Sequence, residues 1–205
     1  MSAERRRTPT EGPERLEAFS DAVMAVIITI LALGLHPPDH TTRTAVREAL
    51  PGLFIYVLSF LFIAIYWNNH HHLLRVTRFI SGAVMWANML LLFCLSLVPV
   101  AAEWLRTDQT DPFSVAFFGL VGLAAALSYT WLVRAIIRAN GRDSEVALAV
   151  RSDVKGNISL ALYALGVALA IPGLWAAAYA CYAAVAVIWL IPDRRFTHEH
   201  DAGGS

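Results

Sequence analysis

Six long apolar runs, separated by short polar or proline-containing connections, constrain this chain more than any other feature. At 1.5 Å of rise per helical residue, about 20 residues cover the roughly 30 Å hydrocarbon core of a bilayer. The mean hydropathy of +0.54, with only 16% of residues charged, is also too high for an ordinary soluble domain. We therefore predict an all-α integral membrane protein with six transmembrane helices.

Helix-breaking residues between the runs predict where each helix ends. The first helix is expected over 15–35 and the second from Pro51 to the polar cluster 68–72, after a polar loop that reaches about Glu48. The remaining helices are expected over about 79–102, 112–138, 154–171 and up to 191. The chain then divides into a mobile basic N-terminal tail (1–12), a six-helix transmembrane domain (13–192) and a polar C-terminal tail (193–205).

Lys and Arg residues are distributed unevenly between the two sides of this arrangement. With the N-terminus in the cytoplasm, thirteen of the sixteen fall on the cytoplasmic side, and three, Arg43, Arg47 and Arg106, fall outside. Cytoplasmic loops of membrane proteins carry the excess of basic residues. We therefore predict a multi-pass protein of the cell membrane with both termini in the cytoplasm.

The first run combines an apolar stripe with a polar corner. At 100° per residue, Ala22, Val26, Thr29 and Leu33 fall within about 60° of one another, with Ile30 at the edge of this stripe. Asp21 points about 100° away. A carboxylate inside a membrane span is costly and needs a partner on another helix.

Three consecutive histidines at the end of the second run admit more than one role. Imidazole binds metals and titrates near neutral pH, so a metal site or a proton relay is one interpretation. Consecutive helical residues diverge by about 100°, however, so these histidines cannot chelate one ion together, and we predict no metal site. The structural interpretation pairs His70 with Asp21 inside the bundle and takes further hydrogen bonds from Ser20, Asn69 and Asn88.

The stripe of the first helix also has two interpretations. Apolar side chains repeated around an axis can close a pore by dewetting, and a hydroxyl one turn away can contact a passing ion. The stripe would then act as a hydrophobic gate. Alternatively, Val26, Ile30 and Leu33 belong to an ordinary packing face, which such residues form more often. The residues alone favour the packing face.

Three motifs shift this balance toward a pore. They are RLEAFSD at 15–21, WNNHH at 67–71 and WAN at 86–88, on the first, second and third predicted helices. In this order they resemble the RxxxFSD, W-x-N-H-H and W-x-N signatures of the transmembrane-protein-175 family of potassium channels. The resemblance covers the first half of the chain closely, and the last three helices agree in architecture only.

The resemblance implies a tetramer of six-span subunits whose four first helices line the pore. It implies pore constrictions at Val26, Ile30 and Leu33 and a filter threonine at Thr29, which are residues of the stripe. It also implies a structural polar network, which maps onto Arg15, Ser20, Asp21, Trp67, His70 and Asn88. His72 stands where the family often has Arg. Val26 stands where Ile is common, and its smaller side chain implies weaker potassium selectivity.

We therefore expect a potassium-permeable, leak-type cation channel that is a homotetramer in the lipid bilayer. It should have no enzymatic activity, no cofactor and no nucleic-acid partner, and K⁺ is its permeant ion. The alternative is a proton-coupled secondary transporter that uses Asp21 and His70 as its relay. Against the transporter, the two halves of the chain lack a matching pair of Gly/Pro-interrupted spans.

Overall fold

The computed structural model describes residues 11–37, 42–141, 143–149 and 154–190. These ranges are helical throughout apart from short turns and contain no strand. The helices are α1 (Glu11–Leu33), α2 (Arg43–Arg75), α3 (Gly82–Ser96), α4 (Val98–Thr107), α5 (Pro112–Asn140), α6 (Glu145–Ala149), α7 (Val154–Ala170) and α8 (Trp175–Leu190). The all-α prediction is therefore confirmed.

Each of the six predicted helices has a counterpart. Four helical segments are long and apolar enough to cross a membrane: Gly12–Leu33, Arg43–Arg75, Gly82–Thr107 and Pro112–Asn140. α7 and α8 are apolar but shorter, with 17 and 16 described residues. The count of six spans stays a prediction. The predicted tails lie outside the described residues except for Glu11 and Gly12, with which α1 begins.

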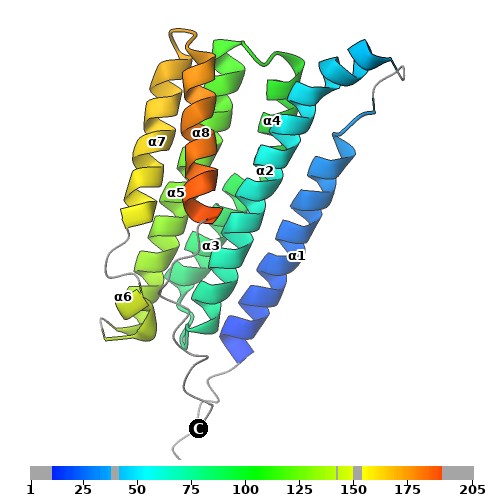
Figure 1. Ribbon diagram of the computed structural model, residues 1–205. Helices are drawn as coiled ribbons and strands as arrows, with labels where there is room; N and C mark the ends of the chain where they lie inside the picture. The colour runs from blue at the N-terminus through cyan, green and yellow to red at the C-terminus, as the bar shows by residue number, and fades with distance from the viewer. Residues whose placement is uncertain (1–10, 38–41, 142, 150–153, 191–205) are drawn as a thin grey trace, which may run out of the picture.

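α2 begins earlier than the sequence pattern predicted. Thr42 accepts a hydrogen bond from the backbone N–H of Ala45 at 3.2 Å, so the helix starts at Arg43 and includes the residues expected to form a loop up to Glu48. Pro51 lies inside the helix and cannot donate to the carbonyl one turn before it. Figure 1 shows the first turns of α2 at an angle to the rest of the helix, as expected for a proline bend.

The third predicted helix is divided in two at Leu97. Pro99 lies in the first turn of α4, where its missing N–H interrupts the hydrogen bonds that would continue α3. The backbone N–H of Leu97 instead bonds to the carbonyl of Cys94 at 3.2 Å. α4 then extends to Thr107, so Glu103, which follows the predicted end of this helix at about 102, is helical.

The helices run side by side along one direction (Figure 1). α5 packs against α3, α4 and α7, and α7 and α8 form a hairpin. α1 lies at the edge of the bundle and contacts α2, α3 and α4. The first turn of α1 and the last turns of α2, α5 and α8 point to the same end of the bundle, which we call the base. One face of α1 is therefore left uncovered by the subunit.

Candidate functional site

The predicted stripe lies on the uncovered face of α1. The exposed fractions of Val26, Ile30 and Leu33 are 55%, 50% and 79%, and Ala22 and Thr29 are also exposed. The opposite face is buried against the neighbouring helices and consists of Leu16, Ser20, Met24, Ile27 and Leu31. α1 is therefore two-sided: one face holds it in the subunit, and the stripe faces outward.

Thr29 supplies the polar group of this face. Its hydroxyl donates a hydrogen bond to the backbone carbonyl of Val26 at 2.8 Å. Because the hydroxyl proton is directed at the helix backbone, the oxygen lone pairs remain available as acceptors. A cation would contact the Thr29 hydroxyl oxygen through these lone pairs.

A cavity of about 690 Å³ lies beside the end of this face that is farthest from the base. Ile30 and Leu33 of α1 line it, together with residues of α2 and α4. At its rim the Arg106 guanidinium donates to the Glu103 carboxylate at 2.7 and 3.1 Å. The apolar stripe therefore ends next to a charged rim.

A chain of buried hydrogen bonds joins α2, α3 and α1 near the base. His70 Nε2 donates to Asn88 Oδ1 at 2.7 Å, and Asn88 Nδ2 donates to Ser20 Oγ at 2.9 Å. The Ser20 hydroxyl donates in turn to the carbonyl of Leu16 at 2.8 Å. All three side chains are fully buried. Donation runs in one direction, from His70 through Asn88 and Ser20 to the Leu16 carbonyl. This last acceptor has no proton to pass on.

Asp21 belongs to a separate pair. Its carboxylate accepts a hydrogen bond from the Trp67 indole N–H at 3.0 Å. The sequence prediction that His70 hydrogen-bonds Asp21 is thus corrected, since Asn88 occupies the position next to His70. A turn of about 100° per residue aims Ser20 at the interior and leaves Asp21 half-buried at the edge of α1.

Glu17 and His71 form a contact that the sequence analysis missed. Glu17 Oε1 lies 2.7 Å from His71 Nδ1, close but without hydrogen-bond alignment, so the contact is mainly electrostatic. The His71 ring stacks on Trp67 with centroids 5.8 Å apart. Glu17 precedes Asp21 by four residues and His71 follows Trp67 by four, so this helical spacing could have revealed a second pair.

Two predicted members of the network lie apart from it. Arg15 is exposed and makes no hydrogen bond or ion pair within the described ranges. Asn69 donates to the carbonyl of Ile65 on its own helix at 2.8 Å, and its backbone carbonyl accepts from Tyr129 at 3.3 Å. The hydrogen-bonded members are therefore Ser20, Asp21, Trp67, His70 and Asn88.

Glu17, Asp21 and His71 also have a spacing that suits a divalent cation. Each offers one ligand atom, and these atoms lie within 4.8 Å of one another. The contacts described above already give each of these groups a neighbour without an ion: Trp67 for Asp21, and Glu17 and His71 for each other. The absence of a metal stays a prediction.

Residues 15–99 match the protein-family model described as "Endosomal/lysosomal potassium channel TMEM175". A potassium channel of Chryseobacterium sp. strain P1-3 is 43% identical over 183 residues, which are 88% of this chain and 94% of that protein. A potassium channel of Streptomyces collinus is 37% identical over 123 residues, covering 56% of this chain and 60% of that protein.

More distant relatives agree with this assignment. The proton channel TMEM175 of Gallus gallus is 22% identical over 123 residues, which make up 25% of its own length. Among solved structures, that of a TMEM175 homologue from Chamaesiphon minutus, described as a lysosomal potassium-selective channel, has a TM-score of 0.71 and 24% identity. It matches 87% of this chain and 96% of that one and supports the fold. The chain belongs to the TMEM175 family of channels.

Proposed function

We propose that the chain is the subunit of a potassium-permeable, leak-type cation channel whose pore is lined by α1. The observation that carries this proposal is the outward stripe of Val26, Thr29, Ile30 and Leu33 on a helix whose other face is buried. The bacterial relatives that are 43% and 37% identical are named potassium channels. Membership of a channel family also confirms the prediction that the chain is not an enzyme.

One stripe cannot surround an ion, so the proposal requires several copies of the chain. We propose a homotetramer in which four α1 helices meet around the axis. Exposed alanines next to the stripe, Ala18, Ala22 and Ala25, support close approach of neighbouring backbones. The exposed fractions given above are those of one isolated subunit. In the proposed tetramer the stripe of each subunit would face the central pore.

In this arrangement the three apolar residues form rings along the pore. Val26 and Ile30 are separated by about 6 Å along the helix axis, and Ile30 and Leu33 by about 4.5 Å. Closely spaced apolar rings exclude water, so an ion must lose hydration to pass them. Thr29, between the first two rings, offers its oxygen as a partial replacement for that water. The rings therefore gate and filter, and Thr29 reduces the cost for the permeant ion.

The hydrogen bonds at the base have a positioning role in this proposal. Ser20 and Asp21 fasten α1 to α3 and α2, through Asn88 and Trp67 respectively. Neither group belongs to the outward stripe. They fix the rotation of α1, and this rotation decides which residues face the axis.

The chain is a multi-pass membrane protein, and we propose that its base faces the cytoplasm. The base holds the last turns of α2 and α5, which carry Arg75 and Arg138. An excess of basic residues on one side favours the cytoplasm for that side. The proposal places the channel in the cell membrane with both termini inside.

Flux of K⁺ and Na⁺ into liposomes that contain the purified protein tests the function. Ile30→Asn should raise flux because it wets an apolar ring, and Thr29→Ala should change the ratio of K⁺ to Na⁺ flux. Leu165→Asn on α7 is the matched control, since Leu165 is 49% exposed and Ile30 is 50% exposed. Flux that requires a proton gradient and is unchanged by the α1 variants would support the transporter instead.

A further inference from the structure

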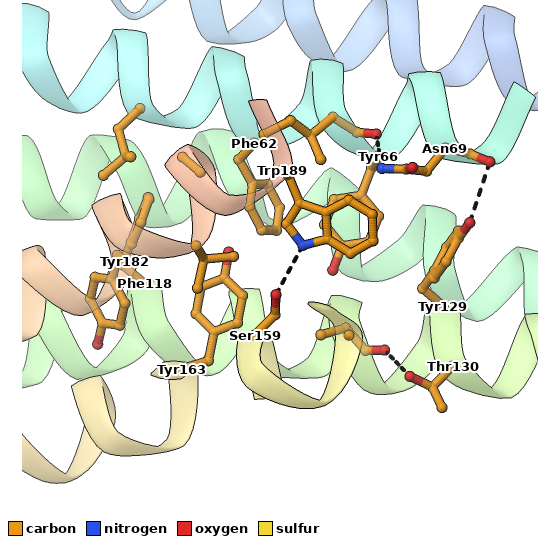
Figure 2. A pocket seen from close by; sticks show the side chains of 16 residues that line it. Phe62, Tyr66, Asn69, Phe118, Tyr129, Thr130, Ser159, Tyr163, Tyr182 and Trp189 are labelled. Carbon is orange, nitrogen blue, oxygen red and sulfur yellow. Dashed lines mark hydrogen bonds between the residues drawn. The ribbon is translucent and has the colours of Figure 1, made fainter. Parts of the chain in front are cut away.

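The cavity of about 690 Å³ beside the stripe has the size of a ligand-binding site. Such sites commonly have volumes of about 300–1,000 Å³. A smaller space between α2, α5, α7 and α8, shown in Figure 2, has a volume of only about 50 Å³. An apolar cavity that admits benzene has about 150 Å³, so the smaller space excludes even one aromatic ring. The larger cavity, which we call the lateral groove, is therefore the better candidate for a binding site.

The walls of the lateral groove are mostly apolar and come from three helices. Ile30 and Leu31 line it on α1, Ile55 on α2 and Pro99 on α4. Ile30 lies at the edge of the stripe and Leu31 on the buried face of α1, so the groove extends from the stripe toward the interior of the subunit. From Pro99 to Arg106, α4 rises by about 10 Å, two thirds of the roughly 15 Å hydrocarbon depth of one leaflet. These walls suit an acyl chain.

The lateral groove lies where two membrane-crossing segments end. These segments are Gly12–Leu33 and Gly82–Thr107, and both of their last residues, Leu33 and Thr107, line the groove. Trp104 also lines it and is 46% exposed, and tryptophan is enriched at membrane–water interfaces. We therefore expect the rim of the groove at the depth of lipid headgroups and its apolar walls at the depth of lipid chains.

The rim of the lateral groove carries one cation and one anion. Arg106 donates from Nε and Nη2 to the Glu103 carboxylate, and its Nη2 also lies 3.4 Å from Nδ1 of His36. A guanidinium has five N–H donors, so the two on Nη1 have no partner in the described part of the chain. The Arg106 and Glu103 side chains are 30% and 49% exposed, so a ligand can reach both.

The position of Arg106 is fixed by its packing on α2. A Cβ atom added at Gly52 would lie 3.4 Å from both Cγ and Cδ of Arg106, so the alkyl chain of the arginine lies directly against the backbone of α2. Glu103 is similarly close to the end of α1, since a Cβ atom at Gly34 would lie 3.5 Å from its Oε2. The two charges are therefore held side by side at the ends of three helices.

An ion pair of this kind complements a headgroup that carries both charges. The Nη1 N–H groups of Arg106 can donate to a phosphate, and the Glu103 carboxylate can accept from an ammonium group. A headgroup with a phosphate alone would place its negative charge next to Glu103, and no second permanent cation is among the described residues that line the groove. A headgroup with a phosphate and an N–H-donating ammonium is the best match.

We infer that the lateral groove binds a phospholipid of the phosphatidylethanolamine class. Its phosphate lies at Arg106, its ammonium group at Glu103, and one acyl chain extends along the groove to Ile30. The orientation proposed above places this lipid in the outer leaflet. Binding depends neither on that orientation nor on the proposed pore, so this inference and the proposed function can fail separately.

Photolabelling of the full chain in nanodiscs of dioleoyl-phosphatidylcholine, whose ammonium group has no N–H, tests this inference. The probe is a trace of phosphatidylethanolamine with a diazirine in the middle of one acyl chain, and mass spectrometry identifies the labelled peptides. Labelling of residues 99–107 should be suppressed by less unlabelled phosphatidylethanolamine than phosphatidylglycerol. α7 does not line the groove and is the internal control, since its labelling should fall only as the probe is diluted.

Two variants test the charges of the rim. Glu103→Gln removes the negative charge at nearly unchanged size, so suppression should need roughly two- to fivefold more phosphatidylethanolamine, the value of one exposed ion pair, and less phosphatidylglycerol. Arg106→Gln should weaken suppression by both lipids. Arg138→Gln is the matched control, because Arg138 is an exposed arginine in the last turn of α5, at the base.

Three results would overturn the inference. The first is suppression of labelling at 99–107 that is no stronger with phosphatidylethanolamine than with phosphatidylglycerol in the unaltered chain. The second is a folded Glu103→Gln variant, checked by circular dichroism, that responds to both lipids as Arg138→Gln does. The third is labelling at 99–107 that stays below that of α7, as expected if a second copy of the chain fills the groove and excludes the probe.

Discussion

His70 Nε2 lies 2.7 Å from Asn88 Oδ1, and both side chains are fully buried. Because an amide oxygen can only accept, His70 carries its proton on Nε2. Its other ring nitrogen, Nδ1, is buried and has no hydrogen-bond partner in the described part of the chain. A relay needs one neighbour that gives a proton to the histidine and another that takes it away. In the described part of the chain Nδ1 has no hydrogen-bonded neighbour, and the Asn88 amide beside Nε2 does not take up a proton. The geometry favours a structural His70 over the proton relay of the transporter alternative.

Replacing Asn88 should destabilise the subunit. Asn88→Ala removes the acceptor for His70 and the donor to Ser20. The buried His70 N–H is left unsatisfied, at about 1–3 kcal/mol, whereas Ser20 keeps its bond to the carbonyl of Leu16. Thermal unfolding in detergent, followed by circular dichroism, measures the loss. Asn69→Ala is the control, because the Asn69 amide bonds only to its own helix. Equal effects of the two substitutions would contradict the role of the buried chain.

Asp21 should matter for assembly more than for conduction itself. Asp21→Ala removes the acceptor of the Trp67 indole N–H, a bond that contributes about 1 kcal/mol, and loosens α1 on α2. We expect a smaller fraction of tetramer by light scattering. Asp21→Asn retains an acceptor oxygen and should behave more like the unaltered chain. An Asp21→Ala tetramer of normal stability and conductance would rule out this role.

Enlarging the first proposed ring should narrow the pore. Val26→Ile adds one methylene group per subunit, so K⁺ flux should fall and the preference for K⁺ over Na⁺ should rise. A barrier higher by about 1 kcal/mol would lower flux roughly fivefold. Liposome flux measures both quantities. Val187→Ile on α8 is the control, since Val187 and Val26 are 56% and 55% exposed. If both variants behave alike, Val26 does not line the pore.

The contact between Gly122 and Tyr163 should tolerate no added side chain. Gly122→Ala would place a Cβ atom against the Tyr163 ring, and overpacking of this kind costs about 1–3 kcal/mol. Gly82→Ala in the first turn of α3 meets no atom within 4 Å and should be neutral or slightly stabilising. Unfolding in detergent compares the two variants. A neutral Gly122→Ala would show that α5 and α7 are less closely fixed than described.

The positions of the helices could be predicted because membrane spans must be apolar and breakers must lie between them. α5 begins at Pro112, as predicted, and ends at Asn140, two residues after its predicted end. The start of α2 could not be predicted in the same way, because it depends on a single capping bond, in which the Thr42 side chain accepts from the Ala45 N–H. The stripe of α1 was found by helical spacing, which also determines the face that the structure leaves exposed.

The partners of the polar residues were harder to predict, for a physical reason. His70 and His71 differ in direction by about 100°, so the rotation of α2 about its axis decides which one meets α1 and which meets α3. Sequence spacing gives the directions of side chains relative to one another on one helix. It does not give the rotation of that helix relative to its neighbours. Close contacts across helices, such as that of Gly122 with Tyr163, were missed for the same reason.

The one-sided attachment of α1 has a mechanical consequence. From Ala22 to Leu33, no described side chain of α1 hydrogen-bonds to another helix, whereas Ser20 and Asp21 both do. α1 therefore resembles a lever with its pivot at the base, and Leu33 lies about 20 Å along the lever from Ser20. A tilt of about 5° over that length would displace Leu33 by roughly 2 Å and Val26 by only half as much. In the proposed pore, the ring of Leu33, which is farthest from the base, is thus the one whose diameter a small tilt changes most.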